Sequence, residues 1–355
     1  MAYTDIDKPS DYFETKLYTG TGSELAITGV GFQPDLIWFK QRSAVRNHAL
    51  VDSVRGRSKV VFPDLTNAEE TSAASTNDLV SFDSDGFTVG ITNVSGSFNT
   101  SSGTHVAWNW LGGGTASSNT DGSITSSVSA NTTAGFSIVS YTGNATSGAT
   151  VAHGLGVTPA MMIVKNRSAV EEWGVYHVSN GNTHVQYLNT TGAKSDDAGF
   201  WNDTTPTSSV FTVGNSTRVN QNGSAIIAYC FAEKQGYSKF GSYTGNGNAD
   251  GTFVYTGFKP AFILVKRSSA SGDNWLMFDN KRDTYNVTEN FFEANSSDAE
   301  KTSASQKVDF LSNGFKMRAT GAASNGSGST YIYMSFASEP FTTSTTNGSI
   351  PATAR

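Results

Sequence analysis

The same block of sequence is written three times in this chain, and each copy opens with the letters YTG, at Tyr18, Tyr141 and Tyr243. In each copy a proline precedes a lysine by six residues, and an arginine follows. These residues are Pro34, Lys40 and Arg42, then Pro159, Lys165 and Arg167, then Pro260, Lys266 and Arg267. Each copy closes on an aromatic segment, THVAWNW, SAIIAYCFA or STYIYMSFA. Order and spacing hold over about 100 residues per copy, a period that predicts tandem domains rather than the turns of a solenoid.

Within each copy, short aromatic and β-branched segments alternate with clusters of Gly, Asn, Asp and Ser, a pattern typical of β-sandwiches and barrels. In the PDLIWFK segment, Leu36, Trp38 and Lys40 share one face of a strand, while Ile37 and Phe39 share the other. Both faces are apolar, so we expect this strand to be covered on both sides. The sequence therefore predicts an all-β chain of three tandem β-sandwich modules, each closing its own hydrophobic interior.

Helical periodicity is weak throughout the chain. Only Leu65–Ser75 predicts one or two helical turns, with Thr66 or Asn67 as the cap and Glu69 or Glu70 behind it.

Composition places the module boundaries. The Gly/Ser/Asn-rich stretch Leu111–Gly122 predicts a linker, and the short EKQGYSK segment predicts that the second and third copies lie close together. The predicted parts are an N-terminal docking arm with the first strand (1–17), module 1 (18–112), a linker plus module 2 (113–236), module 3 (237–341) and a polar C-terminal tail (342–355).

Charge and cysteine content exclude several classes of function. Charged residues make up 15% of the chain, the net charge is −6, and no Lys/Arg cluster stands out, so we expect no nucleic-acid partner. Cys230 is the sole cysteine, lies in the apolar segment AIIAYCFA and is interpreted as a buried small hydrophobe. The first residues lack a signal-peptide pattern, and no apolar run approaches the roughly 20 residues of a membrane span. We therefore expect no membrane insertion.

A search for catalytic chemistry finds no nucleophile elbow, zinc motif or phosphate-binding loop, and it predicts no cofactor. The five histidines do not cluster at ligand spacing, and the acids lie mostly in turn-like sequence. Asp196 and Asp197 are adjacent and would point to opposite faces of a strand, and Asp203 lies in a turn context, so a pair of opposed glycosidase carboxylates is not favoured. We expect a protein that is not an enzyme.

One segment resembles half of a calcium loop. Asn246, Asn248 and Asp250 alternate as N-x-N-x-D-G, the spacing of hard oxygen ligands, but Gly257 stands where the twelfth-position acid belongs. A turn between two strands is the favoured interpretation.

Two further residue sets have competing interpretations. The repeated lysines and arginines could bind an anionic ligand, but their presence in every copy favours a structural role, with the lysine stem lying along the sheet. Trp173, Trp201 and Trp275 are the candidates for stacking against a sugar or for assembly contacts.

Long stretches of the chain, including GFQPDLIWFKQRSAVRNHALVDSVRG, HGLGVTPAMMIVKNRS and DFLSNGFKMRATG, resemble a family of tailed-bacteriophage virion proteins of the marine and cyanophage type, which are labelled structural or tail-fibre-like. The resemblance covers residues 3–341. It implies concanavalin-like jelly-roll sandwiches, a location in the virion, homo-oligomers, and partners among tail, portal-adaptor or capsid proteins. It carries over no catalytic residue.

The leading hypothesis is therefore a non-enzymatic virion component on the particle exterior, in the tail-fibre apparatus or decorating the head. A carbohydrate-binding protein that recognises host surface glycans is the alternative, and a polysaccharide depolymerase is the third.

Overall fold

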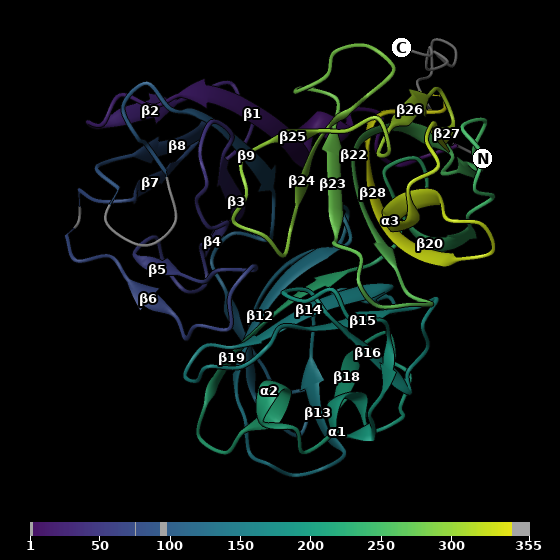
Figure 1. Cartoon of the computed structure of the whole chain (residues 1–355). Helices are drawn as coiled ribbons and strands as arrows, with labels where there is room; N and C mark the ends of the chain where they lie inside the picture. The colour runs from purple at the N-terminus through teal and green to yellow at the C-terminus, as the bar shows by residue number, and fades with distance from the viewer. Residues whose placement is uncertain (1–2, 75, 93–97, 343–355) are drawn as a thin grey trace.

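The computed structural model describes residues 3–74, 76–92 and 98–342, and these form three lobes (Figure 1). Strands account for 43% of the chain and helices for 4%, arranged in antiparallel sheets, which confirms the all-β prediction. The lobes follow the sequence repeats, which we call repeat 1 (residues 13–112), repeat 2 (113–236) and repeat 3 (237–341). Repeat 1 begins at 13 because its first strand starts there, ahead of the YTG letters.

Each repeat contains one larger sheet and one smaller sheet. In repeat 1 the larger sheet has the order β1 (Phe13–Thr19), β9 (Thr104–Trp110), β3 (Leu36–Gln41) and β4 (Ala49–Asp52). The smaller sheet has the order β2 (Leu25–Ile27), β8 (Gly86–Val89) and β7 (Leu79–Asp83), and a separate pair joins β5 (Lys59–Val60) to β6 (Glu70–Thr71). A 3-10 turn, η1 (Pro9–Asp11), precedes β1.

Repeat 2 extends this plan at both ends of its larger sheet. Its order is β10 (Ser117–Asn119), β11 (Ser126–Asn131), β12 (Phe136–Thr142), β19 (Ala225–Phe231), β14 (Met161–Asn166), β15 (Gly174–His177), β16 (His184–Tyr187) and β17 (Ser195–Asp196). The smaller sheet pairs β13 (Ala149–Ala152) with β18 (Val210–Val213), and the helices are α1 (Ala198–Trp201) and α2 (Thr217–Asn220).

Repeat 3 has the larger-sheet order β20 (Ser238–Thr244), β28 (Thr330–Pro340), β22 (Phe258–Arg267), β23 (Leu276–Asp279), β24 (Asn290–Glu293) and β25 (Lys301–Thr302). Its smaller sheet is β21 (Phe253–Tyr255), β27 (Gly314–Met317) and β26 (Val308–Leu311), with one helix, α3 (Ala322–Asn325). In all three repeats the last strand therefore pairs with both the strand that holds the YTG tyrosine and the strand that carries the repeated lysine.

The hydrophobic core is organised differently from the prediction. Each repeat does close an interior between its two sheets, and in repeat 1 this interior receives Ile37 and Phe39 from β3. A further cluster is shared by all three repeats, and β3 contributes Leu36 and Trp38 to it. The alternation read from the sequence is thus present, but one face of the strand is covered by the other repeats.

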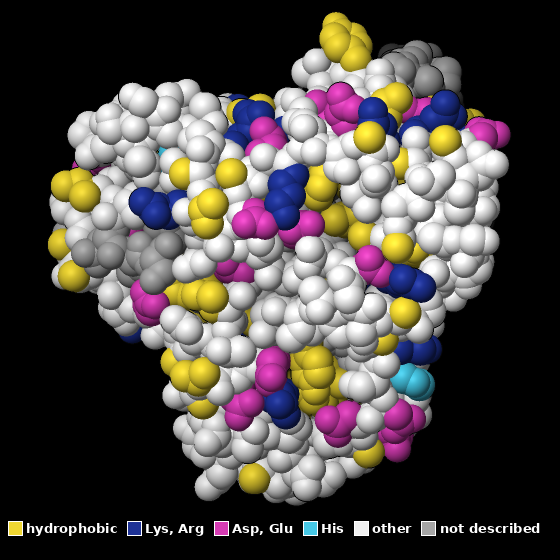
Figure 2. Space-filling model, viewed as in Figure 1, with side chains coloured by type: hydrophobic (Ala, Val, Ile, Leu, Met, Phe, Trp, Pro, Cys, Tyr) yellow, Lys and Arg dark blue, Asp and Glu magenta, His cyan; other side chains and the backbone are white. Residues whose placement is uncertain are grey.

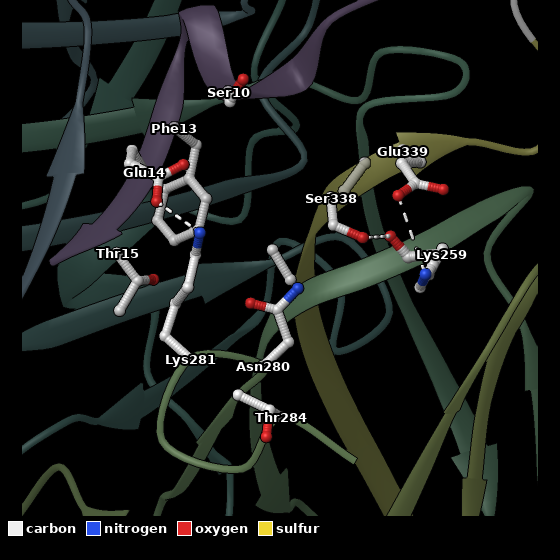
Figure 3. Close-up of a pocket in the computed structure, with 12 residues that line it drawn as sticks. Ser10, Phe13, Glu14, Thr15, Lys259, Asn280, Lys281, Thr284, Ser338 and Glu339 are labelled. Atoms are coloured by element: carbon white, nitrogen blue, oxygen red, sulfur yellow. Dashed lines mark hydrogen bonds and ion pairs between the residues drawn. The ribbon is translucent and has the colours of Figure 1, made fainter. Parts of the chain in front are cut away.

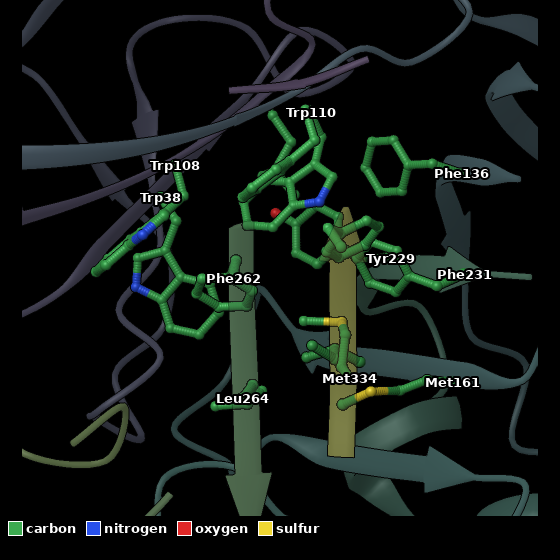
Figure 4. Packing of buried hydrophobic residues seen from close by; sticks show 14 of the residues in the cluster. Trp38, Trp108, Trp110, Phe136, Met161, Tyr229, Phe231, Phe262, Leu264 and Met334 are labelled. Atoms are coloured by element: carbon green, nitrogen blue, oxygen red, sulfur yellow. The ribbon is translucent and has the colours of Figure 1, made fainter. Parts of the chain in front are cut away.

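Figure 4 shows aromatic and sulfur-containing side chains from all three repeats meeting in this shared cluster, which we call the central core. The stacked rings of Phe13 and Phe336 join repeats 1 and 3, with centroids 5.1 Å apart. Trp110 lies edge-on to Phe262 of repeat 3 at 6.2 Å and to Phe231 of repeat 2 at 6.4 Å. Since large aromatic side chains bury the most apolar area per residue, the central core binds the three repeats into one body.

Among the described residues, the predicted helical turns differ from expectation, and the N-terminal arm has defined contacts. The described part of the N-terminal arm packs on the chain itself: Thr4 Oγ1 donates to Gln235 O at 2.7 Å, and Ile6 is buried in the central core. The predicted helical turns are absent from residues 65–74, where Glu70–Thr71 forms β6. Of the predicted C-terminal tail, residues 343–355 lie outside the described residues.

Candidate functional site

The three repeated lysines lie where the repeats meet. Their side chains are fully buried, and each ammonium group donates to a backbone carbonyl of another repeat. The contacts are Lys40 Nζ to Ser297 O at 2.9 Å, Lys165 Nζ to Thr66 O at 2.9 Å, and Lys266 Nζ to Thr191 O at 3.1 Å. Repeat 1 thus reaches repeat 3, repeat 2 reaches repeat 1, and repeat 3 reaches repeat 2. We call these contacts joint 1–3, joint 2–1 and joint 3–2.

Burial changes the acidity of all three lysines in the same way. Removal of the ammonium groups from water lowers the pKa of Lys40, of Lys165 and of Lys266 to about 8. Nearby acids oppose this shift, for example Asp64 and Asp298 beside Lys40. The preceding prolines of the motif, at 34, 159 and 260, are also buried. No ligand-binding role is needed to explain why the motif is repeated.

The repeated arginines also contact the neighbouring repeat, but only at joint 1–3 and joint 2–1. Arg42 forms an ion pair with Glu300 of repeat 3 at 2.8 Å, and Arg167 forms one with Glu69 of repeat 1 at 2.7 Å. Arg267 instead pairs with Asp273 of its own repeat at 3.0 Å. Glu69, which the sequence suggested as a helix-capping acid, is therefore a joint residue.

A second, buried ion pair supports each of those two joints. In repeat 1 the guanidinium of Arg55 binds the carboxylate of Asp52 and also contacts Glu69 at 3.1 Å. Tyr229 of repeat 2 enters this group, donating from its hydroxyl to Asp52 Oδ2 at 2.8 Å.

In repeat 3 the same arrangement joins Arg282 to Asp279 and, at 3.2 Å, to Glu300. Here Trp108 of repeat 1 donates from Nε1 to Asp279 Oδ2 at 3.1 Å. The repeated D-x-x-R letters at 52–55 and 279–282 are the sequence signal that could have revealed these residues.

Joint 3–2 carries uncharged groups at these positions. His177 takes the place of Asp52, and its Nε2 contacts Tyr333 O at 3.0 Å. Burial lowers the pKa of His177 to about 4. Asn180 takes the place of Arg55 and donates to Gln186. His48 of repeat 1 likewise contacts Glu293 O of repeat 3 through Nε2 at 3.2 Å, so both histidines contribute to joints rather than to a metal site.

The tryptophans proposed as sugar or assembly contacts are buried, with exposed fractions of 0–1%, so none of them offers an indole face to a ligand. Trp173 donates from Nε1 to Phe62 O at 2.8 Å across joint 2–1, and Trp275 to Tyr187 O at 2.9 Å across joint 3–2. Trp201 packs inside repeat 2 and donates to His184 O. The proposed stacking role for these residues is thereby corrected.

The residues of the half calcium loop are occupied by turn contacts. Asn246 Oδ1 accepts from Asn248 N, and Asn248 Oδ1 accepts from Asp250 N, both at 2.9 Å. The carboxylate of Asp250 pairs with Lys316 at 2.6 Å, which lowers its pKa. Among the described residues, no group of three or more His, Cys, Asp or Glu lies close enough together to hold a metal ion.

The acids considered for glycoside hydrolysis do not come together. Asp197 caps α1, accepting from Gly199 N at 2.9 Å, while Asp196 lies exposed in β17. Asp203 has a positive φ of 49° and contributes its carbonyl to Asn182. Cys230 is buried, and burial raises the pKa of its thiol to about 12, so the thiolate nucleophile is disfavoured.

A polar cavity of about 400 Å³ lies where the start of β1 meets the start of β22 and the end of β28 (Figure 3). The ammonium group of Lys281 points to Glu14 across this cavity at 2.9 Å, and Lys259 lies 3.7 Å from Glu339. The hydroxyl of Thr15, on the wall, is buried and lacks a hydrogen-bond partner among the described residues. The cavity is large enough for a small polar ligand.

The outer surface in Figure 2 is mostly neutral, with acidic and basic side chains placed next to one another. None of the described helices is long and apolar enough to cross a membrane.

A family model described as a domain of unknown function (DUF7483) matches residues 8–340 of the chain. No curated protein matches it.

Proposed function

Because the chain belongs to the DUF7483 family over residues 8–340, a family described as a domain of unknown function, we propose its role from its own geometry and from the phage-like sequence. The chain is a non-enzymatic structural protein on the exterior of a phage particle, in the tail apparatus or on the head. It acts through assembly contacts with other virion proteins, and its repeats are three sandwich modules of the jelly-roll type.

The observation that carries this proposal is the set of contacts that the buried polar groups make. Lys40, Lys165 and Lys266 each bind one repeat to another. The two buried Asp–Arg pairs lie within repeats 1 and 3, and each accepts a hydrogen bond from a side chain of another repeat. Catalytic sites are where buried, pKa-shifted groups converge on a cleft, whereas these groups face backbone carbonyls and ion-pair partners. Such a chain is suited to holding its shape outside a cell without disulfides.

Labelling of intact particles tests the proposal. Gold-tagged antibody against the purified protein should decorate one fixed position, at the head, collar or tail tip. Absence of the protein from purified particles, with the protein abundant in the infected cell, would contradict it.

A glycan-binding role is a second candidate, and the cavity beside Thr15 is the observation that favours it. Its walls supply carboxylate, ammonium and hydroxyl groups, which are the partners that sugar hydroxyls use. A glycan array with the intact protein should give a signal that is lost in Lys281→Ala and kept in Lys239→Ala, a lysine outside the cavity that pairs with Glu233. Absence of binding at millimolar sugar would exclude this role.

A further inference from the structure

Among the described strands, β21 at the end of the smaller sheet of repeat 3 has a partner on one side only. β21 pairs with β27, and the flanking contacts are Met317 N to Thr252 O at 3.1 Å and Thr256 N to Asn313 O at 3.0 Å. Alternate residues of a strand direct their backbone groups to opposite sides, so those of Phe253 and Tyr255 point away from β27. An open edge of this kind is a template for another strand.

The same edge in repeat 2 is covered. β13 pairs with β18 as β21 pairs with β27, with Val151 opposite Phe211 and Val254 opposite Phe315, so that Thr150 is the counterpart of Phe253. The preceding linker supplies the cover: Ile124 N donates to Thr150 O at 2.9 Å, and Thr150 N donates to Ser123 Oγ at 2.8 Å.

Three linker residues have specific roles in this cover. Ile124 is 7% exposed and belongs to the interior of repeat 2. Ser123 provides the hydroxyl contact described above. Gly122 approaches so closely that a Cβ there would lie 2.5 Å from Thr150 O. The sequence Gly-Ser-Ile is therefore suited to capping this kind of edge.

The C-terminal tail repeats those letters at the same distance from the core. Thr346–Ile350 reads TNGSI, and Thr120–Ile124 reads TDGSI. Trp110 and Phe336 hold the same place in the last strands of their repeats, opposite Leu36 and Phe262. The isoleucine follows that aromatic residue by fourteen positions in both cases, 110 to 124 and 336 to 350.

The described chain ends beside the open edge. Phe341 N donates to Gly257 O at 3.2 Å, two residues beyond the end of β21. Gly348 lies seven positions after Phe341. At about 3.3 Å per residue these seven steps span up to about 23 Å, more than the three-residue strand needs.

The exposed aromatic residues favour repeat 3 as the acceptor. Phe253 and Tyr255 are 44% and 56% exposed, and Phe341 beside them is 38% exposed. In repeat 1 the counterpart of Phe253 is Ala26, and Lys16 lies next to that edge, its Nζ donating to Gly29 O at 3.0 Å. A lysine at an edge is a common protection against strand addition, so repeat 1 is the poorer acceptor.

We propose that residues 343–355 dock on the open edge of β21 in their own chain, with Gly348–Ile350 taking the place in repeat 3 that Gly122–Ile124 takes in repeat 2. The smaller sheet of repeat 3 is then completed by the tail, and the aromatic side chains of Phe253 and Tyr255 are partly covered.

Amide hydrogen exchange of the full-length protein tests this docking. The amides of Phe253 and Tyr255 should exchange roughly tenfold more slowly in the full-length chain than in a chain that ends at Thr342. Gly348→Val and Ile350→Asp should abolish this difference, because one crowds the strand and the other buries a charge. Ser344→Asp, in the tail but outside the motif, is the matched control and should keep the protection, and the Thr150 amide should be unchanged in every variant.

Equal exchange of the Phe253 and Tyr255 amides in the full-length and shortened chains would overturn the proposal. Protection that rises with protein concentration, together with a dimer in light scattering, would overturn it as well, because the tail of a second copy would then be the occupant.

Discussion

Joint 2–1 and joint 3–2 are built on the same backbone contacts but differ in charge. At both, the repeated lysine and a tryptophan donate to carbonyls of the neighbouring repeat. A backbone bond follows in each, Glu69 N to Arg167 O at 2.8 Å and Lys194 N to Ser268 O at 3.2 Å. The buried Asp52–Arg55 pair and its glutamate occur only at joint 2–1 in this comparison. The lysine and backbone contacts therefore suffice to position a repeat, and the ion pairs are an addition that the third joint does without.

The largest expected difference between the joints comes from removing one partner of the buried pair. Arg55→Met leaves Asp52 and Glu69 without their shared cation, and breaking a buried pair in this way costs about 3–5 kcal/mol. The matched change at joint 3–2, Asn180→Met, removes one neutral hydrogen bond and should cost about 1 kcal/mol. Urea unfolding of both variants measures the difference. Equal losses of stability in the two variants would mean that the buried charges add no stability to joint 2–1.

The buried lysines are common to all three joints and predict a pH dependence. Their pKa of about 8 in the folded chain is below the usual value near 10.5, so the unfolded chain holds more protons between pH 8 and 10.5. The free energy of unfolding should therefore rise as the pH rises from 7.5 to 9, by about 1 kcal/mol for each lysine and roughly 3–4 kcal/mol in total. Melting curves across this range measure it, and Lys40→Met should reduce the slope by about one third. A flat or falling profile would contradict the burial of the ammonium groups.

Substituting the repeated arginines should give a smaller difference in stability between joint 2–1 and joint 3–2. Arg167→Gln removes an ion pair that crosses joint 2–1, and about 1–2 kcal/mol should be lost because Glu69 is largely enclosed. Arg267→Gln removes a pair within one repeat, partly exposed, which should cost at most about 1 kcal/mol. Unfolding of the two variants side by side gives the comparison. A greater loss for Arg267→Gln would contradict it.

Placing an acid at the position in joint 3–2 that corresponds to Glu69 should have the smallest effect on the free energy of unfolding. Lys194 occupies the place at joint 3–2 that Glu69 occupies at joint 2–1, since both donate their backbone N–H to the neighbouring repeat. Lys194→Glu should bring a carboxylate to Arg267 and add up to about 0.5 kcal/mol. Lys194→Gln is the control for loss of the lysine charge. If Lys194→Glu and Lys194→Gln have the same unfolding midpoint, the new carboxylate has formed no ion pair with Arg267.

Much of the local structure could be predicted from the sequence. The repeat, the all-β character and the two apolar faces of the strand around Trp38 follow from spacing and alternation, which are local properties. The structural interpretation of Lys40 also rested on repetition, and the structure gives that residue a carbonyl of another repeat as its partner.

The joints could not be predicted, because alternation tells which residues share a face and not what covers it. Trp173 and Trp275 were predicted as ligand-binding or assembly aromatics, although each donates a hydrogen bond to a neighbouring repeat. Glu69 was expected near the start of a helix because the surrounding sequence resembles a helix cap. In the structure it pairs with Arg167, which lies 98 residues away in the sequence. Contacts of such sequence separation depend on how the three repeats close on one another.

The central claim is that the three repeats share one core and form a single body, and calorimetry tests it most directly. If the central core binds the repeats together, the intact chain should melt in one transition whose calorimetric and van't Hoff enthalpies agree. Two or three separate transitions, or a van't Hoff enthalpy near one third of the calorimetric value, would show repeats that unfold independently and would contradict the account.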